Sequence, residues 1–298
     1  MTRPPNSPPN LERPILNSET TTSLLTRLSA QLRAAGIEQP RREARLLLAF
    51  SLRCRIETLL LRDQITEIEA EAAQNLVARR AAHEPLAFLT GHANFWSLTL
   101  AVSPATLIPR ADSETLIEAA LAQFPQRDDV RRILDLGTGT GALLLAALTE
   151  FPAAHGLGID RIAAAAQLAR ANAQALGLAP RSHFIVADWA APLAGSFDLI
   201  LANPPYIPSA DLPGLMPDVA QYEPASALDG GGDGLEAYRA ILADLPHRLA
   251  PHGAAILECG LGQAAPLRAM AEALGFATTI RHDLATIPRA LIITRPNP

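Results

Sequence analysis

The sequence predicts an α/β protein whose larger part is a mainly parallel sheet with helices on both faces. Three observations lead to this fold class. Strand-like and helix-like segments alternate from Arg131 to the C-terminus, as they do in parallel sheets. The preceding region, from Thr22 to about Gly91, has a helical apolar period only. The chain has 298 residues, which allows two domains at roughly 100–200 residues each.

The N-terminal third is predicted to be a tail followed by a small helical domain. Residues 1–18 are proline-rich and polar, so we expect a flexible tail there. Over residues 19–91, Thr66 and Glu69 have the spacing of a capping box at the start of a long helix. No strand pattern interrupts this region. One face of its first helix is predicted to carry Leu25, Leu28 and Leu32.

Arginine outnumbers acidic residues in the middle of this helical region. Two interpretations are open: a solvated basic face, or a docking surface for an acidic or nucleic-acid-bearing partner. The arginines are Arg41, Arg42, Arg45, Arg53, Arg55 and Arg62, against Glu43 and Glu57.

The apolar period changes to two near Asn94. Trp96 and Leu98 begin an alternation that continues to Val102, which predicts a strand. A linker is therefore expected over residues 92–112, and the second domain over residues 113–298. In that domain we expect strands at 133–136, 156–159, 183–186, 197–201, 254–258, 277–280 and 290–294, and helices at 142–150, 163–175, 235–249 and 264–274. The last two strands have no helix between them, so they should form an antiparallel pair at that edge.

Composition excludes several function classes. The 25 basic residues are all arginine, so the chain has no lysine for a Schiff base or for the usual P-loop. The net charge of -5 provides no general basic field for nucleic acid. Cys54 and Cys259 lie far apart and fit no metal-binding motif, so we expect no metal site. No run of about 18 apolar residues is present, and prolines stand where a signal peptide needs an apolar stretch. We therefore expect a cytoplasmic protein without a membrane anchor.

Three successive strands are predicted to end in acidic residues at the same edge of the sheet. Asp135 precedes a glycine turn, and the next strand ends at Asp160, where a carboxylate can accept the ribose hydroxyls of a nucleoside. The third strand ends in Asp188 and Trp189, which could hold and stack on adenine. The glycine turn lets the backbone approach a ligand at a helix N-terminus. It consists of Gly137, Thr138, Gly139, Thr140 and Gly141. A dinucleotide and S-adenosylmethionine fit this pattern about equally.

The fourth strand runs into Asn203-Pro204-Pro205-Tyr206, which indicates methyl transfer to a planar amino group. Asn203 offers a side-chain carbonyl as an acceptor. Pro204 and Pro205 lack an N–H and hold their carbonyls rigidly, and Tyr206 offers a flat face. Two acceptors and a stacking face suit a planar –NH2 group whose lone pair must be turned toward a sulfonium methyl. No metal or covalent nucleophile is needed for this step.

Together these motifs resemble the HemK/PrmC family, the peptide-chain release factor glutamine methyltransferases. Further segments match the family's pattern, and the resemblance extends from about residue 22 to the C-terminus. One departure is Ala111, where the family usually has proline. The matching segments are Glu84-Pro85-Leu86-Ala87-Phe88-Leu89-Thr90-Gly91, Phe95-Trp96, Leu107-Ile108-Pro109-Arg110, Asp112-Ser113-Glu114-Thr115 and Tyr222-Glu223-Pro224.

The resemblance implies a seven-stranded Rossmann-like class I methyltransferase domain, a β-hairpin linker and an N-terminal helical domain that docks the substrate. It implies methylation of the glutamine amide nitrogen in the Gly-Gly-Gln motif of class 1 release factors, with S-adenosylmethionine as cofactor. Cofactor contacts then fall on residues 137–141, Asp160, Trp189 and Asn203. Substrate contacts fall on Asn203, Pro204, Pro205 and Tyr206, of which Asn203, Pro204 and Tyr206 are the expected catalytic residues. Three residues are expected to line the site without an assigned role: Arg110, Glu114 and Glu223.

Other substrates remain open at this point. A glutamine of a ribosomal protein, or an adenine-type amino group of a nucleic acid, poses the same chemical problem to the same tetrapeptide. The sequence pI of about 5.8 and the lack of a recognisable target-recognition domain count against nucleic acid. A non-catalytic adapter with this fold would not need the tetrapeptide of residues 203–206. We expect a monomer whose partner is a release factor.

Overall fold

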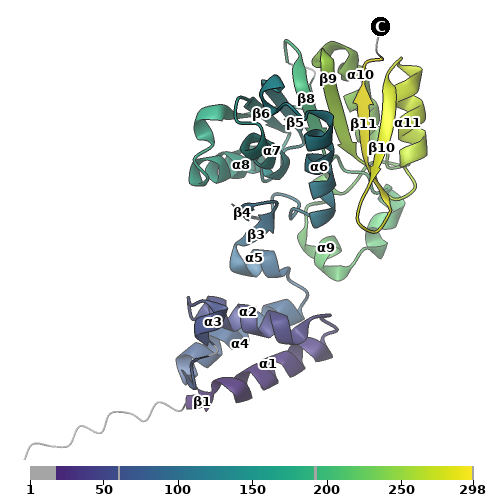
Figure 1. Ribbon diagram of the computed structural model, residues 1–298. Helices are drawn as coiled ribbons and strands as arrows, with labels where there is room; N and C mark the ends of the chain where they lie inside the picture. Colours follow the sequence, from purple (N-terminus) through teal and green to yellow (C-terminus); the bar gives the residue numbers. More distant parts are fainter. Residues whose placement is uncertain (1–17, 60, 191–192, 297–298) are drawn as a thin grey trace, which may run out of the picture. The chain divides into compact units, whose positions relative to one another are not determined.

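The computed structural model describes residues 18–59, 61–190 and 193–296, and these form two compact units that meet in sequence at Thr90 and Gly91 (Figure 1). Of the predicted tail over residues 1–18, only Ser18 lies among the described residues, and it begins a strand. The first unit contains β1 (Ser18–Thr20), α1 (Thr21–Ala34), α2 (Pro40–Ser51), α3 (Ile56–Leu59), β2 (Gln64–Thr66), α4 (Glu67–Ala81) and α5 (Leu86–Thr90).

The first unit is held together by apolar faces of α1, α2 and α4. On α1 the fully buried leucines are Leu24, Leu28 and Leu32, whereas Leu25 is only partly buried. Leu25 nevertheless packs against the same core, so the predicted face of Leu25, Leu28 and Leu32 is confirmed, with Leu24 as a further buried residue. At the start of α4 the predicted capping box is present, with Thr66 accepting the Glu69 N–H and Glu69 accepting the Thr66 N–H at 2.9 Å.

The expectation that no strand interrupts the helical region was wrong. β1 and β2 pair in antiparallel fashion, with Glu19 opposite Ile65. Each strand has three residues, too few to show an alternating pattern, and only Ile65 in β2 is buried. The pairing depends on main-chain hydrogen bonds, which leave no signature in the side-chain sequence.

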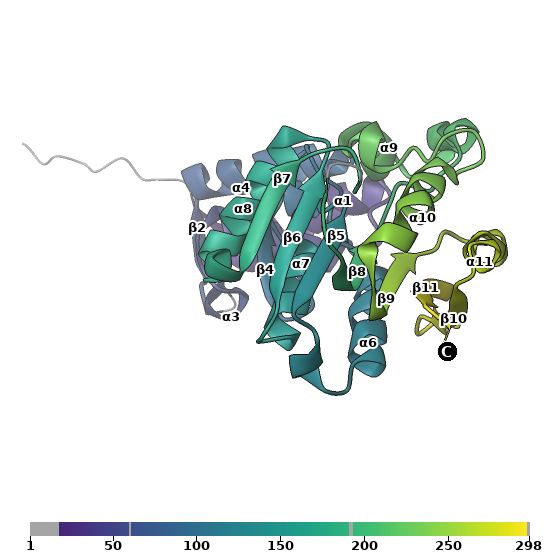
Figure 2. The same cartoon turned by 90° about the horizontal axis from the view of Figure 1, so that it is seen from above.

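The second unit is built on a seven-stranded sheet in the order β10-β11-β9-β8-β5-β6-β7 (Figure 2). Five neighbouring strands are parallel to one another: β9, β8, β5, β6 and β7. β11 is antiparallel to both of its neighbours, so the expected antiparallel pair at the C-terminal edge is confirmed. Its elements are β3 (His92–Phe95), β4 (Leu98–Ala101), α6 (Glu114–Gln123), β5 (Arg132–Leu136), α7 (Ala142–Glu150), β6 (His155–Asp160), α8 (Ala163–Ala175), β7 (Ser182–Val186), β8 (Phe197–Ala202), α9 (Pro217–Tyr222), α10 (Glu236–Arg248), β9 (Leu249–Glu258), α11 (Ala264–Ala273), β10 (Ala277–His282) and β11 (Pro288–Thr294).

Alternate residues of the central strands enter two separate hydrophobic cores. In β5, Ile133 packs with residues of α6, α7 and α8, whereas its neighbour Leu134 packs with residues of α10 and α11. Figure 1 shows these two groups of helices flanking the sheet. The sheet is therefore covered on both faces, which confirms the predicted α/β class. Of the helices that the structure describes, none has the length and apolar character to cross a membrane.

The hairpin of β3 and β4 belongs to the second unit and is fastened to it by polar side chains. Trp96, predicted as part of a strand, instead occupies the tight turn with a φ of 55°. Its indole Nε1 donates to Glu150 at 2.7 Å, and its main-chain N–H donates to Glu114 at 2.7 Å. Buried Asn172 of α8 bonds both main-chain groups of Ala101 and the carbonyl of Thr140. The hairpin is thereby tied to the glycine turn that follows β5.

Candidate active site

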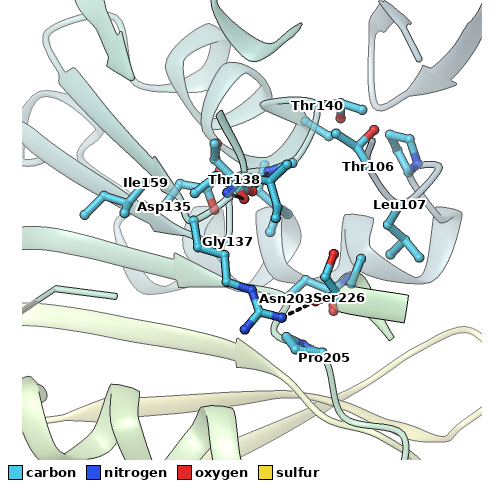
Figure 3. A pocket seen from close by; sticks show the side chains of 18 of the residues that line it. Thr106, Leu107, Asp135, Gly137, Thr138, Thr140, Ile159, Asn203, Pro205 and Ser226 are labelled. Carbon is cyan, nitrogen blue, oxygen red and sulfur yellow. Dashed lines mark hydrogen bonds between the residues drawn. The ribbon is translucent and has the colours of Figure 1, made fainter. Parts of the chain in front are cut away.

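A pocket opens at the carboxyl ends of β5, β6 and β8, where the direction of strand succession reverses. β6 and β7 lie on one side of β5, and β8 and β9 lie on the other, so this is the position where open α/β sheets bind ligands. The pocket has a volume of about 970 Å³ including the solvent in its open mouth. Figure 3 shows Asp135, Gly137 and Thr138 on one side of it and Asn203, Pro205 and Ser226 on another.

The glycine turn after β5 needs left-handed backbone at three positions. Gly137, Gly139 and Gly141 have φ values of 74°, 55° and 84°, which side chains rarely adopt. The N–H groups of Gly137 and Thr138 donate to the Ile159 carbonyl at 2.9 and 2.8 Å. The turn is thus held against β6. Gly141 itself does not line the pocket: a Cβ there would lie 3.1 Å from Leu145, so this glycine permits close packing of α7.

Asp160 is the last residue of β6, and its carboxylate shapes the pocket floor. One oxygen accepts the Gly139 N–H at 2.9 Å, and the other accepts the Ile162 N–H at 2.9 Å. A carboxylate can accept about four hydrogen bonds, so two positions remain for a ligand. Adjacent hydroxyls of a ribose match these two free positions.

Asp135 lines the pocket, and its carboxyl group is almost entirely buried. The residue is 1% exposed, and its Oδ2 accepts from Thr138 Oγ1 at 2.6 Å. Its Oδ1 is buried and has no hydrogen bond within the described part of the chain. Burial raises the pKa of Asp135 to about 7, and the bond from Thr138 acts against that shift. A cation bound in the pocket would supply the missing partner and hold this carboxyl in its charged form.

Asp188 and Trp189 line the same pocket beyond the end of β7. Trp189 has a φ of 49°, an uncommon conformation for a bulky residue, which indicates that its surroundings hold it in place. A Cβ added to Gly137 would lie 4.0 Å from the Trp189 ring, so the ring borders the glycine turn. Asp188 is exposed, and its carboxylate is accessible to a polar ligand edge. Both residues are where an adenine could be held.

The tetrapeptide after β8 reaches the pocket in part. Asn203 and Pro205 line it, whereas Pro204 is buried and Tyr206 is partly buried and is not among the lining residues. The Tyr206 hydroxyl donates to Glu258 at 3.4 Å, and burial raises the pKa of Tyr206 to about 12. Asn203 Nδ2 donates to Ser113 Oγ at 3.0 Å. Asn203 therefore has its side-chain carbonyl available at the pocket.

One wall of the pocket comes from a segment whose role sequence reasoning left unassigned. Thr106 and Leu107 lie opposite the tetrapeptide (Figure 3). The segment is fixed by buried Glu223, which accepts from the Arg110 guanidinium and from the Ile108 N–H at 3.1 Å. Arg110 lines the pocket as expected. Glu223 and Glu114 do not: the first anchors the wall, and the second bonds the hairpin turn.

A second wall was not predicted at all. Ser226 and Ala227 belong to a short helical turn in the long connection between β8 and α10. The Ser226 carbonyl accepts from Arg161 at 3.1 Å (Figure 3). Arg161 directly follows Asp160, so this bond links the β8–α10 connection to the residue proposed for the ribose. Within this connection the sequence signal was Tyr222-Glu223-Pro224, and Ser226 and Ala227 lie just beyond it.

Comparison with known proteins identifies the family to which the chain belongs. The family profile of the PrmC N-terminal domain matches residues 23–91, and a methyltransferase domain profile matches residues 127–239. The release factor glutamine methyltransferase of Rhodospirillum rubrum is 47% identical over 275 residues, covering 91% of this chain and 84% of the relative. The enzyme of the same name from Bradyrhizobium diazoefficiens is 44% identical, covering 89% and 91%. The chain belongs to the release factor glutamine methyltransferase family.

A solved structure supports the fold independently. The methyltransferase from Pyrococcus furiosus superimposes with a TM-score of 0.50 at 17% identity, covering 75% of this chain and 98% of that one. At that identity the likeness concerns the fold alone.

Membership in this glutamine methyltransferase family makes S-adenosylmethionine the cofactor, and the pocket fits it. The orphaned Asp135 oxygen suits the methionine ammonium group, and Asp160 has two free acceptor positions for the ribose. Trp189 borders the place where adenine would lie. Of the twelve residues predicted from the sequence for cofactor or substrate, the structure brings nine to the pocket: Gly137, Thr138, Gly139, Thr140, Asp160, Asp188, Trp189, Asn203 and Pro205. The other three, Gly141, Pro204 and Tyr206, stand behind its lining.

Proposed function

We propose that this chain transfers a methyl group from S-adenosylmethionine to the side-chain amide nitrogen of the glutamine in the Gly-Gly-Gln motif of class 1 release factors. One observation carries the proposal. Within a chain of this family, Asn203 at the end of β8 faces the same pocket as the glycine turn and Asp160. A site for a nucleoside and a site for a planar amide therefore adjoin each other.

The residues of the tetrapeptide have distinct proposed roles. Asn203 Oδ1 and the Pro204 carbonyl accept the two N–H bonds of the substrate amide. Holding both N–H groups in one plane turns the nitrogen lone pair toward the pocket, where the cofactor supplies an electrophilic methyl group. Pro205 borders that position. The Tyr206 ring packs beside Gly260 and is anchored by its hydroxyl, so its proposed contact with the substrate amide uses a fixed ring.

Methyl transfer to a purified release factor tests the proposal. We expect label from radioactive S-adenosylmethionine to enter the release factor, and none to enter a release factor whose Gly-Gly-Gln glutamine is replaced by alanine. A ribosomal protein fraction, duplex DNA and RNA are incubated in parallel. Label in any of these at a higher rate than in the release factor would overturn the proposed substrate.

We further propose that the N-terminal unit, over residues 19–91, docks the release factor through a basic groove. The groove is lined by Arg33 of α1 and by Arg41 and Arg45 of α2. These three arginines are exposed, and they form no ion pair with the described residues. By contrast, Arg62 at the same groove pairs with Glu69 at 2.7 Å. An acidic segment of the substrate would supply the missing counter-charges.

Reversing two of these charges tests the docking role. Arg41→Glu combined with Arg45→Glu is expected to raise the KM for intact release factor about tenfold at low salt, because steering by complementary charge is lost. The turnover number should stay unchanged, and the difference should shrink as salt rises. Arg131→Glu combined with Arg268→Glu, at two exposed positions of the other unit, changes the net charge equally and is the charge-matched control. An unchanged KM in a folded double variant would assign docking to another surface.

The proposed substrate also indicates where the enzyme acts and in what form. Release factors act in translation, so we place the reaction in the cytoplasm, with the chain acting as a monomer on a protein and without a nucleic acid substrate. Light scattering of the purified protein, alone and with release factor, measures the stoichiometry directly.

A further inference from the structure

A buried carboxyl group adjoins the catalytic end of β8 and has no part in the roles assigned above. Glu258 is the last residue of β9 and is 2% exposed. β9 runs parallel to β8, with Leu257 opposite Ala202. Glu258 and Asn203 therefore follow paired positions and lie next to each other at the carboxyl edge of the sheet. A carboxyl at that depth is costly unless its oxygens have partners.

The partners of Glu258 connect it to Asn203 through one hydroxyl group. Ser113 Oγ donates to Glu258 Oε2, and Asn203 Nδ2 donates to the same Ser113 Oγ at 3.0 Å. Ser113 is 4% exposed and lines the pocket. The Tyr206 hydroxyl donates to the other carboxylate oxygen at 3.4 Å. Both side chains that flank the two prolines of the tetrapeptide thus depend on this carboxyl group.

The number of hydrogens in this chain of bonds determines which way the Asn203 amide faces. A serine hydroxyl has a single hydrogen, and here Glu258 accepts it. Toward Asn203, Ser113 can then only accept, so it must receive the NH2 group of the amide. The carbonyl Oδ1 is left on the opposite side, and no hydrogen bond occupies it within the described residues. That is the acceptor the substrate N–H needs.

We infer that Glu258 is a positioning residue for methyl transfer, which acts through Ser113 to hold Asn203 with Oδ1 toward the substrate amide. The inference rests on the proposed function and adds a group that does not touch the substrate. An asparagine amide is nearly symmetric in shape, so packing alone discriminates poorly between its two orientations. The ionised carboxylate can only accept hydrogen bonds. The Ser113 hydroxyl must therefore donate to Glu258, and the Asn203 amide must donate to Ser113.

The charge state of Glu258 makes this arrangement sensitive to pH. The groups facing it are Asp112 and Ser113 before α6, Tyr206 after β8, Tyr238 of α10, Cys259 and Arg289 of β11. Burial raises the pKa of Glu258 to about 7, while Ser113 and the Arg289 guanidinium act in the opposite direction. Once protonated, Glu258 can donate to Ser113, which then has a hydrogen for Asn203 Oδ1. The amide can then turn over, and the rate should fall as pH drops through about 7.

Glu258→Gln tests the inference because it keeps the shape and removes the obligatory acceptor. We expect the single-turnover rate, with saturating cofactor and release factor, to fall between about tenfold and 100-fold, as for a misplaced catalytic group. The KM for S-adenosylmethionine should be unchanged. The rise in rate that we expect for the wild type between about pH 6 and pH 8 should be lost. Glu272→Gln, which removes an exposed carboxylate on α11, should keep both the rate and the pH profile.

Ser113 provides a second variant in case the buried exchange prevents folding. Ser113→Ala removes the link between Asn203 and Glu258 and should lower the rate by a similar factor, whereas Ser113→Thr keeps the hydroxyl and should restore it. The inference is overturned if either Glu258→Gln or Ser113→Ala keeps the wild-type rate and pH profile. It is also overturned if the loss is uniform at every pH, as a purely structural role would give. A wild-type protein that does not methylate release factor would instead contradict the proposed function.

Discussion

Replacing Asn203 by alanine is expected to lower the single-turnover rate of methyl transfer about 100- to 1,000-fold, the loss typical when one preorganised hydrogen-bonding group is removed. Asn203→Ala deletes the Oδ1 acceptor and leaves the Pro204 carbonyl, so one of the two substrate N–H bonds loses its partner. The amide nitrogen is then no longer held in the orientation that its lone pair needs. Single-turnover measurements with saturating cofactor and release factor isolate this step.

Two comparisons separate chemistry from binding and folding. Because Asn203 lines the cofactor pocket, calorimetric titration must show that S-adenosylmethionine still binds. Asn203→Asp retains an oxygen toward the pocket but cannot donate to Ser113, so cofactor binding should survive and the rate should lie between those of wild type and Asn203→Ala. Asn94→Ala, which removes an exposed asparagine of the β3–β4 hairpin, should leave the rate unchanged. A wild-type rate for Asn203→Ala would contradict the amide mechanism itself.

Much of the fold could be predicted because periodicity and strand-terminal residues are local properties. The helices over residues 142–150 and 163–175 were predicted with the bounds that the structure has: the first directly follows the glycine turn, and the second has a regular apolar spacing. β1 and β2 were missed because three-residue strands carry no period. Trp96 was assigned to a strand because its spacing fits, yet its backbone turns at a φ of 55°. Sequence spacing does not distinguish the end of a strand from a tight turn.

In the site, too, features that depend on neighbouring residues in the sequence could be predicted, whereas contacts between distant residues could not. The acids at the ends of β5, β6 and β7 were predicted because each follows an apolar strand. Glu258 ends β9 in the same way and was overlooked, so the same rule applied to the fifth parallel strand would have found it. Ser113 and Glu223 lie in segments that resemble the family's pattern, but their hydrogen-bond partners could not be predicted. Their partners lie 145 and 115 residues away in the chain, and only folding brings them together.

Replacing Asp160 by alanine is expected to weaken binding of S-adenosylmethionine about 10- to 150-fold, which corresponds to about 1.5–3 kcal/mol for hydrogen bonds to a charged acceptor. The variant removes the two free acceptor positions proposed for the ribose hydroxyls. It also removes the acceptor of the Gly139 N–H, so the glycine turn loses one restraint. Calorimetric titration of the folded variant measures the combined effect.

A matched carboxylate at the other end of the sheet distinguishes a general loss of stability from the loss of a cofactor contact. Asp198 in β8 accepts the main-chain N–H groups of Arg131 and Arg132 at 2.9 and 2.8 Å, which is the same kind of clamp away from the pocket. Asp198→Ala should therefore lower the melting temperature without weakening cofactor binding.

A ligand that lacks the ribose hydroxyls separates the two roles of Asp160 itself. The wild-type protein should bind S-adenosylhomocysteine more tightly than its 2′,3′-dideoxy analogue, because only the natural ribose donates to the carboxylate. In Asp160→Ala the two ligands should bind with nearly equal affinity. If the variant still prefers the natural ribose by the wild-type factor, the hydroxyls are held by another group. Asp160 would then serve only to fasten the glycine turn to the end of β6.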